Sequence, residues 1–166
     1  MEELRWDLIF VARAALASAL AFIIGWEREA RGSPAGDRTY AMVAVGAAAF
    51  TAVGVESFPA TAEKLIAGVV TGVGFLGAGM ILREGTVVRG LTTAASVWAV
   101  SSIGVVVGAG EYVIGVSLTA LILLILEMHY LPLLSRLGAN STRARAEQAI
   151  LLEEEAPLQQ SREDRA

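Results

Sequence analysis

The sequence lacks cysteine and has few charged residues for its length. A chain without cysteine can form no disulfide and no thiolate metal site, so these two kinds of stabilisation are excluded. Only 18% of the 166 residues are charged, whereas about a quarter is usual in a soluble domain. The hydrophobic share is 55% and the mean hydropathy is +0.59. Because the charges stand in short islands between long apolar runs, the composition indicates an integral membrane protein.

Five apolar segments predict an all-α fold, a polytopic transmembrane helical bundle. They cover residues 8–24, 39–55, 65–82, 91–109 and 112–131. The second segment is short, and a re-entrant segment is the alternative to a full span. The N-terminal residues MEELRWD are acidic where a signal peptide has a basic region, so the first segment is expected to stay as a membrane helix. We expect a transmembrane domain over 1–137 and a short polar, largely disordered tail over 138–166.

Basic residues are distributed unequally between the two sides of this predicted bundle. Ten arginines fall in the first loop, the third loop and the tail, whereas only Arg5 and Lys64 fall on the opposite side. Basic residues are retained in the cytoplasm, so the N-terminus is predicted outside and the C-terminus inside. That orientation requires an odd number of spans, which agrees with five.

Glycines crowd the third segment, where Gly72, Gly74 and Gly77 spell G-x-G-x-x-G. A dinucleotide-binding loop with this pattern follows a strand, but here the pattern lies inside an apolar run, so nucleotide binding is disfavoured. At about 100° per residue, Gly68, Gly72 and Gly79 share one helix face, and Gly74 and Gly77 share another. Small residues let helices pack closely in lipid, so we expect this segment at the centre of the bundle. A partly unwound segment that exposes carbonyls to ions is the alternative.

Three carboxylates, Glu27, Glu29 and Asp37, lie in the first predicted cytoplasmic loop. Mg²⁺ is commonly bound through one or two carboxylates and several waters, so these residues are the candidate metal ligands. An equal number of arginines is interleaved with them. Ion pairs with those arginines are therefore favoured over a metal site.

A few other polar residues stand inside or beside the predicted spans. Arg13 lies under about 10 Å deep in the first span, so its side chain is expected to snorkel to the outer headgroups. The hydroxyls of Thr92, Thr93 and Ser96 can bond back to helix carbonyls or across to a neighbouring helix. His129 is the single histidine and has no serine and aspartate arrangement to orient it, so no enzymatic activity is expected.

Three ordered motifs resemble the MgtC/SapB family of bacterial inner-membrane proteins. They are ERE-x-R-G-x-P-A-G-x-R-T in 27–39, G-x-G-F-L-G-A-G-M-I in 72–81 and V-R-G-L-T-T-A-A in 88–95. The resemblance covers roughly residues 8–131. Members often carry a soluble domain after the membrane part, and here only the membrane domain is expected.

The resemblance implies a multi-pass protein of the bacterial inner membrane that regulates magnesium or cation homeostasis and adaptation to low magnesium. Besides the lipid bilayer, the implied partner is a membrane complex such as an ATP synthase or a cation transporter, and a homo-oligomer is possible. No nucleic acid and no cofactor are expected, although Mg²⁺ is a possible ligand. The alternatives are a small oligomeric Mg²⁺ transporter and a purely structural scaffold.

Residues at the motif positions become the candidates for function. The candidates for contact with a partner or an ion are Glu27, Arg28, Glu29, Asp37, Arg38, Thr39, Arg83, Arg89, Gly90 and Thr92. The candidates for helix packing are Gly68, Gly72, Gly74, Gly77 and Gly79. Asp37 stands where the family commonly has an apolar residue, and Thr92 where one well-known member has asparagine.

Overall fold

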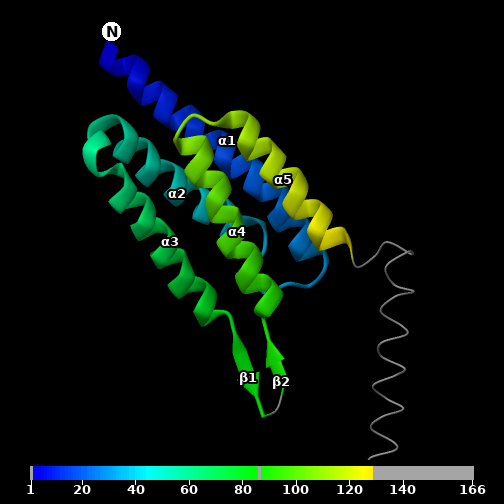
Figure 1. Cartoon of the computed structure of the whole chain (residues 1–166). Coiled ribbons are helices and arrows are strands. Elements are labelled where there is room, and N and C mark those ends of the chain that lie inside the picture. The colour runs from blue at the N-terminus through cyan, green and yellow to red at the C-terminus, as the bar shows by residue number, and fades with distance from the viewer. Residues whose placement is uncertain (1, 86, 129–166) are drawn as a thin grey trace, which may run out of the picture. The chain divides into compact units, whose positions relative to one another are not determined.

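The computed structural model describes residues 2–85 and 87–128, which form helices that alternate in direction and one short hairpin (Figure 1). The elements are α1 (Glu2–Ala30), α2 (Asp37–Ser57), the 3-10 turn η1 (Pro59–Thr61), α3 (Ala62–Gly79), β1 (Leu82–Glu84), β2 (Val87–Arg89), α4 (Leu91–Gly108) and α5 (Tyr112–Glu127). The helices α1 to α4 are long and apolar enough to cross a membrane, and α5 is a shorter apolar helix. The prediction of an all-α membrane bundle is confirmed.

The second predicted segment is one continuous helix of 21 residues, so α2 has the length of a full span and is not broken as a re-entrant segment would be. The end of the fifth predicted segment, His129 and the predicted tail lie outside the described residues.

The first helix extends further than its apolar run predicts, because the residues that stop a helix come later. Gly32 adopts a φ of 73°, and the Ser33 N–H then bonds to the Arg28 carbonyl at 3.0 Å, which is a common way to end a helix. Pro34 follows, where a helix could not continue. Residues 27–29 therefore lie on the last turns of α1, whereas the sequence predicted them in a loop.

A β-hairpin, absent from the prediction, replaces the end of the third segment. Its two strands are antiparallel, with Leu82 opposite Arg89, and it extends beyond the ends of α3 and α4 (Figure 1). Gly90 returns the chain to α4 with a φ of 86°, and a Cβ there would stand 2.0 Å from the Met80 carbonyl oxygen. Glycine is therefore required where the hairpin joins the helices. We call this end of the bundle, where α1 ends and α2 begins, the hairpin end.

The centre of the bundle is formed by α2 and α4, which both contact α1, α3 and each other. Gly104 and Gly108 of α4 face Ala44 and Ala48 of α2. A Cβ at Gly104 would stand 2.5 Å from the Ala44 carbonyl oxygen, and one at Gly108 would stand 2.5 Å from that of Ala48. The two backbones approach this closely because each helix presents small residues four positions apart.

The prediction that the third segment is the centre is wrong. Only Gly77 lies near α4, with its Cβ position 3.5 Å from the Ala94 carbonyl oxygen. A Cβ at Gly68, Gly72, Gly74 or Gly79 would meet nothing within 4 Å. The G-x-G-x-x-G pattern lies inside α3 and follows no strand, so it is not a nucleotide-binding loop. That the four open glycines pack against another helix stays a prediction, and such a helix would belong to another molecule or to another copy of the chain.

Substitution at the α2–α4 contact should separate the glycines that pack from those that do not. We expect Gly104→Ala or Gly108→Ala to lower the free energy of unfolding by about 1–3 kcal/mol, because the added methyl group meets a carbonyl oxygen. The measurement is thermal unfolding in detergent, followed by circular dichroism. The matched controls Gly68→Ala and Gly74→Ala should hold or raise the melting temperature, since alanine favours helix. Equal losses in both pairs would contradict this assignment of the core.

Candidate functional site

The hairpin end brings together loops that are far apart in the sequence. Ser33, just after α1, lies 3.2 Å from the hydroxyl of Thr93 in the first turn of α4, oxygen to oxygen. This contact joins the segment between α1 and α2 to the segment that follows the hairpin. The two arginine-rich loops therefore share one end of the bundle.

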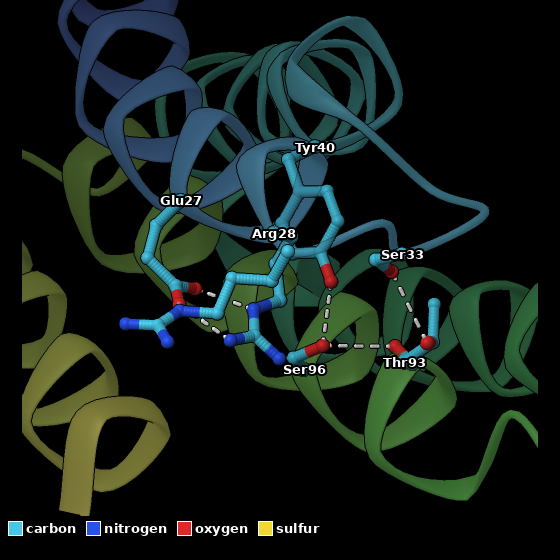
Figure 2. Close-up of polar contacts among 7 residues, drawn as sticks. Glu27, Arg28, Ser33, Tyr40, Thr93 and Ser96 are labelled. Atoms are coloured by element: carbon cyan, nitrogen blue, oxygen red, sulfur yellow. Dashed lines mark hydrogen bonds and ion pairs between the residues drawn. The ribbon is translucent and has the colours of Figure 1, made fainter. Parts of the chain in front are cut away.

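A buried hydroxyl network fixes α2 to α4 at this end (Figure 2). Tyr40 of α2 is fully buried, and its hydroxyl lies 2.5 Å from the Ser96 Oγ of α4. The Ser96 hydroxyl donates to the Thr93 carbonyl at 3.0 Å, so the Tyr40 hydroxyl is the donor to Ser96. The predicted bonding back along the helix and across to a neighbouring helix is confirmed for Ser96, whereas the Thr93 hydroxyl contacts Ser33 between α1 and α2. Tyr40 was missed, although a tyrosine in the first turn of a membrane helix is a recognisable signal.

Glu27 is occupied by two arginines of its own helix. Its Oε1 accepts from the Arg28 Nη2 at 2.5 Å and from the Arg31 Nε at 2.7 Å. The Glu27 and Arg28 side chains are 14% and 12% exposed, so solvent screens this pair less than a surface pair. Figure 2 shows the Glu27–Arg28 pair close to Tyr40. The favoured interpretation of this loop as an ion-pair cluster agrees with these contacts.

The carboxylate of Glu29, in the last turn of α1, reaches the N-terminus of α2. Its Oε2 accepts the Asp37 N–H at 3.2 Å, where a negative charge satisfies a free helix donor and the helix dipole. A Cβ at Gly36 would crowd the same oxygen, so a larger residue there would displace the end of the Glu29 side chain. Glu29, Gly36, Asp37, Arg38 and Thr39 line a polar cavity of about 390 Å³.

The three carboxylates predicted as metal ligands do not converge. Glu27 faces Arg28 and Arg31, whereas Glu29 faces the backbone of α2. Within residues 2–85 and 87–128, no three acidic, histidine or cysteine side chains form a group that could hold a metal ion. A Mg²⁺ site built from Glu27, Glu29 and Asp37 is therefore not formed in this structure.

Four of the remaining candidates are exposed at the hairpin end. Arg38, Arg83 and Arg89 are exposed, and none has an ion pair in the described part of the chain. Arg83 makes one contact, a bond of 3.1 Å from its Nε to the Gly85 carbonyl. Thr92 is exposed as well. Beside these polar groups, the hairpin exposes large apolar side chains, namely Leu82, Val87 and Val88.

A second charged contact lies at the opposite end of the bundle. The Arg13 Nη1 lies 3.3 Å from the Glu56 carboxylate and donates to the Gly108 carbonyl at 3.0 Å, while its Nε lies 3.4 Å from the Tyr112 hydroxyl. The guanidinium thus joins α1 to the ends of α2, α4 and α5. The prediction that Arg13 snorkels to headgroups is wrong, because the protein itself supplies the partners. Glu56 was missed as the partner of Arg13, since the order of residues does not show that the end of α2 lies beside this part of α1.

The comparisons with known proteins agree on one family. A family model described as the MgtC family matches residues 15–131. Protein MgtC of Salmonella typhimurium LT2 is 42% identical over 123 residues, which are 74% of this chain and 53% of that protein. "Putative magnesium transporter YhiD" of Escherichia coli K12 is 38% identical over 130 residues, 73% of this chain and 60% of that protein. Protein MgtC of Brucella abortus is 44% identical over 108 residues, 63% of this chain and 45% of that protein. The chain thus spans about half the length of these relatives. No solved structure matches it.

The hydroxyl network predicts a measurable coupling between α2 and α4. Tyr40→Phe should lower the free energy of unfolding by about 0.5–1.5 kcal/mol, because it removes one buried hydrogen bond. Adding Ser96→Ala should cost less than the sum of the two single changes, since both remove the same bond. Thermal unfolding of the four proteins in detergent measures this coupling. Strictly additive losses would show that the two hydroxyls do not stabilise each other.

Proposed function

Because the chain belongs to the MgtC family, we propose that it is a non-enzymatic inner-membrane regulator of magnesium homeostasis that binds a partner membrane complex. The observation that carries this proposal is the exposed surface at the hairpin end. There Arg38, Arg83 and Arg89 are exposed without an ion pair among the described residues, and the hairpin that carries Arg83 and Arg89 also exposes apolar side chains. The positive-inside rule predicts that this end faces the cytoplasm.

The hairpin end combines a fixed base with a surface available for contact. The Tyr40–Ser96 bond holds α2 to α4, and the Glu27 ion pairs satisfy the charges at the end of α1. Among residues 2–85 and 87–128 the hairpin pairs with no further strand, so its outer edges carry backbone groups without a strand partner there. A rigid base that carries arginines, apolar side chains and free strand edges supports a protein-binding role.

The alternative function, Mg²⁺ transport, is favoured by one observation and weakened by another. The polar cavity beside Glu29 and Asp37 would admit a hydrated cation as cargo, and the relative YhiD bears a transporter's name. At the centre of the bundle, however, Gly104 and Gly108 bring α4 directly against α2. A transport path would therefore have to form between copies of the chain, as an oligomeric transporter would allow.

Binding of the partner should depend on the arginines of the hairpin end. We expect Arg38→Ala and Arg89→Ala each to reduce co-purification of membrane-complex subunits by about tenfold or more, because a charge pair at an interface loses its partner. The measurement is quantitative mass spectrometry of the subunits that co-purify with the tagged chain. The membranes come from cells grown in low magnesium. Arg5→Ala removes an exposed arginine at the opposite end and should leave co-purification unchanged. Equal recovery with all three variants would contradict the proposal.

Transport and regulation predict different results with purified protein. Liposomes that contain the chain and a trapped magnesium-sensitive dye should show no flux above empty liposomes if the chain is a regulator. Flux that depends on the protein and is lost in Asp37→Asn would instead establish transport, because Asp37 lines the polar cavity.

A further inference from the structure

An apolar groove runs along the outside of the bundle between α2 and α3. Its volume is about 620 Å³, and glycines contribute to both of its sides, with Gly46 on α2 and Gly68 and Gly72 on α3. Phe50 and Leu76 line it as well and are exposed, with 62% and 49% of their surfaces accessible. Since a Cβ at any of the three glycines would meet no atom within 4 Å, nothing within the described part of the chain fills the groove.

A single cation stands among the residues that line the groove. Lys64 is the only lysine in the chain and lies in the first turn of α3. The other lining residues are glycine, alanine and large apolar side chains. Lys64 is exposed and has neither an ion pair nor a side-chain hydrogen bond among the described residues. The carboxylate of Glu56, at the nearby end of α2, is instead paired with Arg13.

Lys64 stands where a spanning helix is expected to reach the lipid headgroups. It begins a helix that is long and apolar enough to cross a membrane, at the end opposite the hairpin. Basic side chains at this depth are attracted to the phosphates of lipids. A lipid-facing groove lined by apolar groups, with one unpaired cation at the headgroup level, matches an acyl chain with a phosphate above it.

We propose that this groove holds one acyl chain of a phospholipid whose phosphate binds Lys64. The volume of the groove lies in the ~300–1,000 Å³ range of small-molecule sites. An acyl chain fits the apolar lining of the groove, and its phosphate would pair with the Lys64 cation, which an apolar helix packed there would leave without a counter-charge. This inference does not rest on the proposed regulatory role.

The test measures phospholipid binding to the full chain after purification in detergent and removal of lipid. Native mass spectrometry with added phosphatidylglycerol should show one saturable molecule for each copy of the chain. Gly72→Leu should reduce binding by about tenfold or more, because leucine fills the groove with carbon. Gly74→Leu, on the same helix but away from the groove, adds the same volume and should bind like the original chain.

The headgroup contact has its own variants and its own probe. Lys64→Gln should weaken binding of phosphatidylglycerol about fivefold, and Lys64→Arg should restore it, since one basic side chain near lipid phosphates contributes an effect of this size. Diacylglycerol has the acyl chains without the phosphate, so it should bind about as weakly to the original chain as phosphatidylglycerol binds to Lys64→Gln.

Three results would overturn the proposal. If phosphatidylglycerol binds equally to Gly72→Leu and Gly74→Leu, the groove is not where the lipid binds. If diacylglycerol and phosphatidylglycerol bind equally to the original chain, Lys64 does not bind the phosphate. A change in oligomeric state in Gly72→Leu with unchanged lipid binding would show that the groove is a contact between copies.

Discussion

The close approach of α2 and α4 is the constraint on which the other contacts depend. In lipid, no hydrophobic force drives one apolar helix against another, so small residues and interhelical hydrogen bonds must hold the pair together. Gly104 and Gly108 against Ala44 and Ala48 provide the first, and the Tyr40 hydroxyl provides the second. Because the backbones of α2 and α4 are held in contact, the polar groups at each end of these two helices have fixed positions relative to the helices around them.

The two ends of the bundle use those polar groups differently. At one end, Arg13 binds a carboxylate and the last carbonyl of α4, where a cation also suits the helix dipole. At the hairpin end, Glu27 and Glu29 are satisfied within α1 and at the start of α2, yet Arg38 and Arg89 face outward. A polar group with partners inside the chain stabilises the fold, whereas an outward cation is available to a partner. This contrast is why the hairpin end, and not the Arg13 contact, supports the proposed function.

The sequence predicts where the helices lie better than it predicts which helices pack against each other, for a physical reason. A bilayer sets the length and polarity of each span, so α1 to α4 appear as apolar runs. Small residues four apart favour close packing, but α3 shows this pattern as clearly as α4, and only the fold decides that Gly104 meets a neighbour while Gly68 does not. The Arg13–Glu56 pair depends in the same way on two helix ends that meet in space. Strands of three residues are too short for a periodic signal, which explains the missed hairpin.

The open glycines of α3 require a reason outside the described part of the chain. Each glycine in a helix interior costs about 1 kcal/mol relative to alanine in water, and Gly68, Gly72, Gly74 and Gly79 gain no close contact in return. A large side chain at Gly68 or Gly72 would fill the groove against α2, so their smallness preserves a space that fits hydrocarbon. Gly79 shares the face of Gly68 and Gly72 but lies beyond the groove, whereas Gly74 lies on the other face and leaves a second smooth area there. A helix that contributes little to the core of its own bundle is thus shaped on two faces for what surrounds it.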